Sequence, residues 1–232
     1  MKTKIFVLAL FIHIFAYSQE KKVDISVNYK LVYKLDSTSN ELKKENFILF
    51  ADKEKSIYQS IVTYVKDSLL KNTNVNRTIV IKKYTTPNNY IITNDLKNES
   101  LSYFQSCVNT KINYKENKKI IWKLENETKN ISNIDCQKAT TELFGRKWIA
   151  WYSQEYPFPF GPYKFYGLPG LIIELYDSKN DYYFSVYRIK KEKNTIINFD
   201  LQKNYIETNK NKFVEIAYKN TYDANFIFSN IT

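Results

Sequence analysis

Four carboxylates in the C-terminal half have types and spacing that could support catalysis: Glu155, Glu174, Asp177 and Asp181. Two carboxyl groups about 5 to 9 Å apart in a cleft can cleave a glycosidic bond by acid and base or nucleophile chemistry. Glu174 and Asp177 are three residues apart, however, and on a strand they point to opposite faces of the sheet. The simpler interpretation is that these carboxylates are solvent-facing turn residues.

Histidine occurs once in the chain, as His13, inside an N-terminal segment that we expect to be removed. Its loss from the mature chain excludes Ser-His-Asp and Cys-His catalysis, His-ligated zinc sites and histidine-based pH switching. Any catalysis would depend on carboxylate, lysine, tyrosine or cysteine side chains. The sequence therefore predicts no catalytic set, no metal site and no cofactor.

Two cysteines, Cys107 and Cys136, could pair, because an exported protein meets conditions in which disulfides persist. A bridge closing this loop of roughly 30 residues would stabilise the fold by about 3 kcal/mol. We predict the disulfide, while two unpaired thiols stay open as the alternative. A thiolate metal site is disfavoured, because two cysteines without histidine form a poor ligand set.

Glycine and proline are concentrated in one segment. All four glycines lie between residues 145 and 170, together with four of the five prolines. Glycine reaches positive φ and permits close backbone approach, whereas proline fixes φ, so their combination predicts a stiff, sharply bent loop. Pro169 and Gly170 suit the centre of a type II turn. Such a loop could carry a binding site, or it could be a structural crossover whose aromatic residues cap the core.

The binding residues we predict are a set of aromatic, cationic and loop residues around this segment: Arg146, Trp148, Trp151, Tyr152, Lys164, Tyr166, Gly167, Leu168, Pro169 and Gly170. Arg146 and Lys164 would meet an anionic group of a ligand. The two-residue period of a strand places Trp148 and Tyr152 on one face and Trp151 on the other. Core packing is the competing role for each tryptophan.

The elements that would position these residues are mostly strands, because the chain is rich in tyrosine, phenylalanine, isoleucine and valine. Alternation and turn residues predict strands over residues 23–35, 45–51, 55–58, 78–84, 90–93, 101–106, 119–124, 134–144, 146–153, 171–176, 182–189 and 196–199. Residues 177–181 would turn a hairpin. Residues 61–70 fit a short helix, a strand or a loop.

The pattern changes at the C-terminus, where residues 208–222 place Phe213, Ile216 and Ala217 on one helical face behind a Thr208 N-cap. We therefore predict a mainly β, α+β fold: a curved or partly closed antiparallel sheet with a C-terminal helix packed against it. Residues 19–232 would form a single domain, since no linker or repeat divides them.

Residues 1–18 are typical of a signal peptide, with two lysines, a short apolar run and a small-x-small end that predicts cleavage after Ser18. The apolar run is short for a membrane anchor. Cleavage lowers the formal net charge from +11 to +9 by removing Lys2 and Lys4. The predicted location is periplasmic or secreted, where a basic surface could meet anionic lipid, glycan or acidic protein. Nucleic acid is not expected, because no basic run is dense.

Residues 166–172 read YGLPGLI, and further segments follow in a fixed order: IWKL at 121–124, CQKAT at 136–140, FGRKWIAWY at 144–152 and GPYKF at 161–165. Together these segments resemble the GLPGLI family of exported Bacteroidetes proteins, most strongly over residues 118–190. The resemblance implies an accessory protein of the cell envelope. It also implies an outer-membrane TonB-dependent receptor or another envelope protein as partner, and it brings no reaction and no catalytic residue.

Three functions are consistent with these observations. The first, which we favour, is a non-catalytic envelope protein whose rigid aromatic loop contacts a partner or an amphipathic ligand such as a lipid or an anionic glycan. The second is a carboxylate-dependent hydrolase, which requires a close carboxyl pair in a cleft. The third is a structural scaffold component, which a buried loop without a nearby pocket would select.

Overall fold

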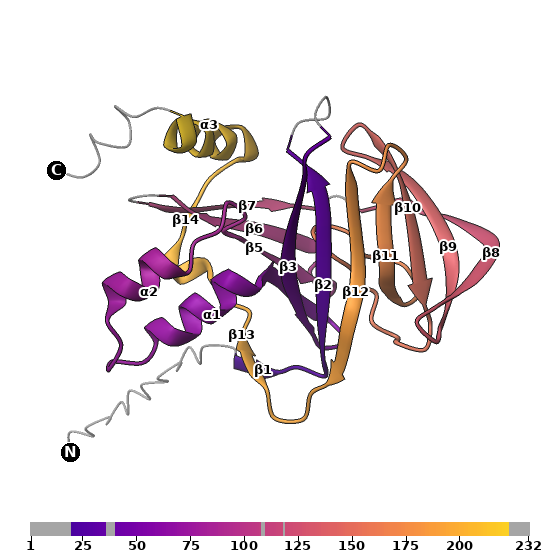
Figure 1. The fold of residues 1–232 in the computed structure, drawn as a ribbon, viewed down its shortest axis with the longest axis horizontal. Coiled ribbons are helices and arrows are strands. Elements are labelled where there is room, and N and C mark those ends of the chain that lie inside the picture. The colour runs from indigo at the N-terminus through magenta and orange to yellow at the C-terminus, as the bar shows by residue number, and fades with distance from the viewer. Residues whose placement is uncertain (1–19, 36–39, 108–109, 118, 223–232) are drawn as a thin grey trace, which may run out of the picture.

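The computed structural model describes residues 20–35, 40–107, 110–117 and 119–222, and its main feature is one twelve-stranded sheet (Figure 1). The first six strands in chain order are β2 (Ile25–Lys34), β3 (Leu42–Ala51), β4 (Lys55–Ser60), β5 (Tyr90–Asp95), β6 (Ser100–Ser106) and β7 (Lys111–Glu116). The others are β8 (Lys123–Ile131), β9 (Ile134–Leu143), β10 (Arg146–Ser153), β11 (Leu171–Asp177), β12 (Tyr182–Lys191) and β14 (Ile206–Glu207).

The strand order is β14-β7-β6-β5-β4-β3-β2-β12-β11-β10-β9-β8. Neighbouring strands are antiparallel except β14, which pairs with β7 in parallel. Ten residue pairs join β2 to β3, and nine join β2 to β12, so β2 links the N-terminal meander to the C-terminal one. The mainly β, antiparallel fold predicted from the sequence is therefore confirmed.

The sheet bends strongly, so that β5, β6 and β7 run nearly across the direction of β2 and β12 (Figure 1). The main core lies inside this bend and includes Tyr29, Phe47, Trp148 and Phe165. A separate two-stranded sheet pairs β1 (Glu20–Lys22) with β13 (Ile196–Asn198). The predicted strand at 196–199 thus exists, but it lies outside the large sheet.

The structure corrects one prediction in the N-terminal half and decides another that the sequence left open. Residues 78–84, predicted as a strand, belong mostly to α2 (Arg77–Lys83), whose first turn is capped by the Asn76 side chain accepting from the Ile79 N–H at 3.2 Å. The ambiguous residues 61–70 form α1 (Ile61–Leu70), capped by the Ser60 hydroxyl. Capping and tertiary position override the strand propensity of the β-branched residues in α2. Strand β7 was not predicted, and β8 begins only at Lys123.

The predicted C-terminal helix is α3 (Lys210–Tyr222), and it packs against the sheet at β7. Phe213 is buried between the rings of Tyr103 and Tyr114, with centroids 5.4 and 4.7 Å away. The cap differs from the prediction, because the Asn209 side chain, not Thr208, accepts from the Lys212 N–H at 2.9 Å.

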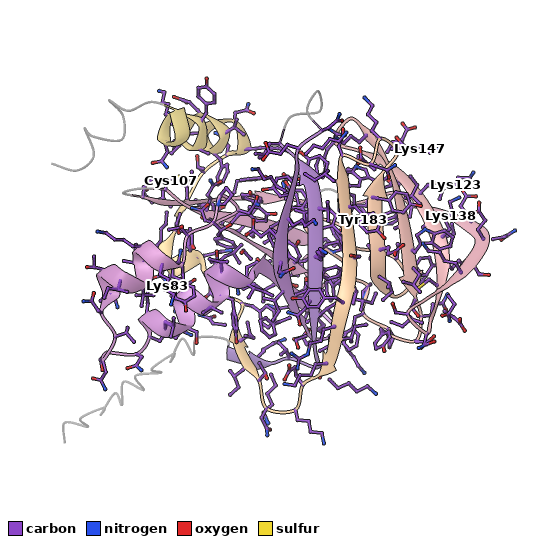
Figure 2. The ribbon with its side chains drawn as sticks, viewed as in Figure 1. Lys83, Cys107, Lys123, Lys138, Lys147 and Tyr183 are labelled. Atoms are coloured by element: carbon purple, nitrogen blue, oxygen red, sulfur yellow. The ribbon has the colours of Figure 1, made fainter. Side chains whose placement is uncertain are left out.

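The predicted disulfide between Cys107 and Cys136 is wrong, because both are buried free thiols. Cys136 lies on β9 in the main core, whereas Cys107 packs near Phe213 in a separate cluster, towards the opposite end of the strand order. Figure 2 shows Cys107 beside α3, across the molecule from Lys138 of β9. Burial raises the pKa of both thiols, that of Cys136 to about 11, which keeps them protonated and unreactive.

The predicted signal peptide, residues 1–18, lies outside the residues that the structure describes. Among the described residues, no helix has the length and apolar character needed to cross a membrane.

Candidate functional site

The glycine- and proline-rich segment, residues 154–170, connects β10 to β11 and packs tightly against the sheet. Phe160, Phe165 and Leu168 are each 1 % exposed. Backbone hydrogen bonds fix its path, including Gly167 N–H to the Pro159 carbonyl at 2.8 Å and Ile172 N–H to the Phe160 carbonyl at 3.0 Å. The segment is therefore an ordered part of the core, with the fixed shape that its composition predicts.

The glycines of this loop serve two different needs. Gly167 has φ +92°, which favours glycine. The predicted type II turn at Pro169 and Gly170 requires a positive φ at Gly170. This prediction is wrong, because the φ of Gly170 is not positive. Gly170 is required for another reason: a Cβ there would lie 2.1 Å from the Ser153 carbonyl oxygen. Close backbone approach, rather than turn type, explains this glycine.

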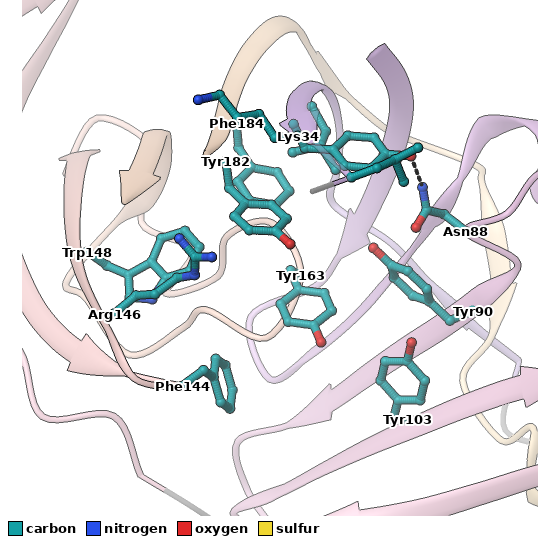
Figure 3. A pocket seen from close by; sticks show the side chains of 13 residues that line it. Lys34, Asn88, Tyr90, Tyr103, Phe144, Arg146, Trp148, Tyr163, Tyr182 and Phe184 are labelled. Carbon is teal, nitrogen blue, oxygen red and sulfur yellow. Dashed lines mark hydrogen bonds between the residues drawn. The ribbon is translucent and has the colours of Figure 1, made fainter. Parts of the chain in front are cut away.

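A cavity of about 340 Å³ opens beside the loop, between the two halves of the bent sheet (Figure 3). Its lining residues come from β2, β5, β6, β10, β12 and the connecting loops: Leu31, Tyr33, Lys34, Leu35, Asn88, Tyr90, Tyr103, Phe144, Arg146, Trp148, Tyr163, Tyr182 and Phe184. Eight of these thirteen residues are aromatic, so flat ring surfaces dominate the wall. The loop contributes Tyr163.

The rings of the cavity wall support one another. Tyr33 and Tyr182 are stacked, with ring centroids 6.4 Å apart and planes 8° apart. Tyr163 meets the Tyr90 ring edge-on at 5.7 Å, and Tyr90 stacks on Tyr103 at 5.2 Å. Such contacts favour one fixed arrangement of the rings. The cavity is therefore preformed by packing between strands.

Arg146 lies at the cavity with its charge already paired. Its guanidinium donates to Asp177 at 2.6 Å and Asp181 at 2.7 Å, and it stacks on the Tyr182 ring at 5.1 Å. The hydrogen bond from Arg146 lowers the pKa of Asp181. The Lys34 ammonium lies 3.7 Å from the same Asp181 carboxylate. Two cations and two carboxylates thus sum to zero charge in this cluster.

Lys164 is not among the residues that line the cavity and occupies a buried site of its own. Its ammonium donates to the Tyr114 hydroxyl and to Glu116 at 2.8 Å, and Glu116 also pairs with Lys210 of α3 at 3.1 Å. The rings of Tyr103, Tyr114, Phe144 and Tyr163 surround it at 4.9 to 5.8 Å. Burial lowers the pKa of Lys164, and the Glu116 pairing opposes this effect. We call this group the Lys164 cluster.

The other predicted site residues are dispersed. The Trp151 ring lies under the Lys129 ammonium at 4.4 Å, and the Tyr152 hydroxyl donates to Gln137 at 2.8 Å. Tyr152 lines a separate, open depression at β8 and β9. The Tyr166 carbonyl accepts from the Trp122 indole at 2.8 Å, Leu168 is in the core, and Pro169 is exposed. Of the predicted set, the structure brings together only Arg146 and Trp148 at the cavity.

Sequence reasoning missed most of the cavity wall: Tyr33, Tyr90, Tyr103, Tyr163 and Tyr182. The available signal was the abundance of tyrosine, with 20 in the chain. Strand alternation assigns a tyrosine to a face, but it does not say which distant strands share a cavity. These five residues come from four strands and one loop, so only the fold identifies them as one site.

The four carboxylates singled out from the sequence are not among the residues that line the cavity. Asp177 and Asp181 converge on Arg146, Glu174 binds Lys129 and the Tyr183 hydroxyl, and Glu155 accepts from the Asp135 N–H. Across the described ranges, no group of three or more histidine, cysteine, aspartate or glutamate residues could hold a metal ion.

Comparison with known proteins finds a short sequence match to one family and solved structures with a similar fold. A model of the family described as "Protein of unknown function (Porph_ging)", a Bacteroidetes-type family, matches residues 144–174. Two structures of PNGF-II, in space groups C2 and P21, are similar with TM-scores of 0.63 and 0.61 at 15 % and 16 % identity over 85 % of this chain. The chain spans about a third of their length, 33 % and 34 %. The search of curated proteins found no match. The fold is thus shared with part of PNGF-II, and residues 144–174 resemble a family of unknown function.

Proposed function

We propose that this chain is an exported binding protein of the cell envelope, of the GLPGLI type, that holds an amphipathic ligand in the aromatic cavity. The observation that supports it is the preformed cavity itself, with eight aromatic residues in its wall and the rigid loop supplying Tyr163. Its volume, about 340 Å³, is within the range of ~300 to 1,000 Å³ typical of small-molecule sites.

The lining favours binding over hydrolysis. A glycosidase-type reaction needs two carboxyl groups facing a substrate, and the thirteen lining residues include no carboxylate. Asp177 and Asp181 come close together, but both are engaged by Arg146. Aromatic walls with a few polar groups are typical of sites that hold a small molecule.

The N-terminal residues support the envelope location. Residues 1–18 have the charge and apolar pattern of a signal peptide. The resemblance to the GLPGLI family suggests a TonB-dependent receptor or another envelope protein as the partner that receives or delivers the ligand.

The ligand proposal is tested by incubating the purified chain with an envelope extract and identifying co-eluting small molecules by mass spectrometry. We expect a retained compound that is lost in Tyr182→Ala, which removes part of the cavity wall. Tyr187→Ala is the matched control, because Tyr187 lies on the same strand but is 53 % exposed. A compound retained equally by both variants, or no retained compound at all, contradicts the proposal.

The location is tested by fractionating cells that express the full chain and sequencing the N-terminus of the product. We expect an envelope or secreted fraction whose first residue is Gln19. An uncleaved chain in the cytoplasm would overturn this part of the proposal.

A further inference from the structure

Resting on the proposed function, we infer that the ligand of the aromatic cavity is a neutral saccharide, held by ring stacking and by hydrogen bonds to uncharged groups. This differs from the expectation from the sequence, in which Arg146 and Lys164 would meet an anionic group of the ligand.

The charges at the cavity are balanced within the chain. Arg146 and Lys34 are its cationic lining residues, and their charges are balanced by Asp177 and Asp181 at distances of 2.6 to 3.7 Å. Lys164 is 5 % exposed and paired with Glu116. An anionic ligand would have to compete with these carboxylates for each cation. A neutral ligand leaves every ion pair intact.

The cavity wall also supplies uncharged hydrogen-bonding groups. Among the described residues, none hydrogen-bonds to the hydroxyls of Tyr90, Tyr103, Tyr163 or Tyr182, and none of these oxygens is sealed from solvent. Figure 3 shows the Tyr90 and Tyr182 hydroxyls directed towards the space between the rings. Burial raises the pKa of Tyr90 and Tyr103, and that of Tyr163 to about 12, so these hydroxyls remain protonated near neutral pH.

Asn88 adds an oriented amide to this set. Its nitrogen donates to Glu45 at 2.5 Å and to the Tyr33 hydroxyl at 3.2 Å, which fixes the side chain. Figure 3 shows the nitrogen pointing at Tyr33 and the amide oxygen on the other side. Both donors are engaged, so the acceptor oxygen is the group that Asn88 offers to a ligand hydroxyl.

The cavity wall combines flat rings with hydroxyl groups. A sugar has an apolar face of C–H groups that can lie on a ring and an edge of hydroxyls that can bond with tyrosine and amide groups. An acyl chain would cover the same rings but leave the Tyr90, Tyr163 and Tyr182 hydroxyls without partners, which costs free energy for each buried polar group. A neutral saccharide satisfies both the rings and the hydroxyls.

The test measures intrinsic tryptophan fluorescence, to which Trp148 of the cavity wall contributes, during titration with three classes of probe. The probes are neutral oligosaccharides (maltose, cellobiose, mannobiose and chitobiose), oligogalacturonate as the charged sugar, and dodecanoate as the acyl chain. We expect at least one neutral saccharide to bind more tightly than oligogalacturonate and dodecanoate. Tighter binding of either of the last two overturns the inference.

A second measurement separates hydrogen bonding from shape. Tyr90→Phe removes one hydroxyl and keeps the ring, and we expect it to weaken saccharide binding by about 3- to 10-fold. Tyr187→Phe, which makes the same change on the exposed surface, should leave binding unchanged. An unchanged affinity in Tyr90→Phe contradicts the role of the hydroxyls.

The outcomes also distinguish this inference from the proposed function. If no neutral saccharide of the panel binds at millimolar concentration while the envelope extract still yields a retained compound, the inference is wrong and the binding function stands. If the extract yields none either, both fail.

Discussion

Two neighbouring residues of the loop, Tyr163 and Lys164, lie in two aromatic regions of different kinds: an open cavity and a buried ion pair. Tyr163 belongs to the cavity, where rings and neutral hydroxyls face a space of about 340 Å³. Lys164 is surrounded by rings as well, including Tyr103, Phe144 and Tyr163 itself, but the protein supplies both the cation and its carboxylate.

The Lys164 cluster and the cavity differ in which of their polar groups are already satisfied within the chain. A buried cation needs a paired anion, and once Glu116 supplies it the Lys164 cluster is complete within the chain. The cavity has its ion pairs completed in the same way, but among the described residues none hydrogen-bonds to the hydroxyls of four of its tyrosines: Tyr90, Tyr103, Tyr163 and Tyr182. The uncharged groups, rather than the charged ones, therefore suggest what the cavity recognises.

The largest effect that would break this comparison is expected from Glu116→Ala. The change leaves Lys164 buried without its carboxylate, which should lower the free energy of unfolding by about 3 kcal/mol. Urea denaturation measures it. Lys210→Ala removes the exposed partner of the same carboxylate and should cost less than about 1 kcal/mol. Equal effects of the two variants would contradict the special role of the buried pair.

The loop that carries Tyr163 and Lys164 can be perturbed at Gly170, and Gly145, in the turn between β9 and β10, provides the control. Gly170→Ala places a Cβ about where the Ser153 carbonyl already lies, at 2.1 Å, and should destabilise by about 2 to 3 kcal/mol. Gly145→Ala meets no atom within 4 Å and costs only the strain of its φ of +72°, about 1 kcal/mol. Thermal unfolding of both variants checks this order, and the reverse order would show that backbone approach is not the constraint.

The two regions should also differ in their response to pH. Burial would raise the pKa of Glu116, but hydrogen bonds and charge from Lys164 and Lys210 outweigh it and lower the pKa below its ordinary value. The stabilisation from this group is therefore present above about pH 4.3, its unfolded value, and is lost as the pH falls through the lower folded value.

Ligand binding should instead be constant from about pH 6 to 9, because Tyr90, Tyr103 and Tyr163 of the cavity wall have raised pKa values. Urea midpoints and ligand titrations over both ranges measure the two responses. A ligand affinity that changes between pH 6 and 9 would contradict this expectation, because it would show that a charged group takes part in ligand binding.

The smallest effect is expected from replacing both charges of the buried pair, in Lys164→Met with Glu116→Leu. Apolar residues of similar size often replace a buried ion pair at little cost, so stability should change by less than about 1 kcal/mol, and ligand affinity should be retained. A loss of binding without a loss of stability would show that the Lys164 cluster takes part in recognition.

Local patterns in the sequence predicted several features that the structure contains. Alternation and the turn residues 177–181 predicted the β11–β12 hairpin, and a helical apolar face with Phe213 predicted α3. These succeeded because each depends on neighbouring residues and on burial of one face. Residues 78–84 failed because their β-branched side chains favour a strand, while Asn76 caps a helix in which only Val80 is buried.

Composition and local patterns were enough to predict a β-rich sheet, one stiff glycine- and proline-rich loop and, through the absence of histidine after His13, a narrow range of chemistry. The three-dimensional arrangement was needed to show that Cys107 and Cys136 are apart, that Arg146 and Lys164 are neutralised, and that tyrosines from β2, β5, β6 and β12 share a wall. The physical reason is that strand alternation fixes which face a side chain takes. Distances between faces, and therefore ion pairs, thiol contacts and cavities, depend on how the whole sheet bends.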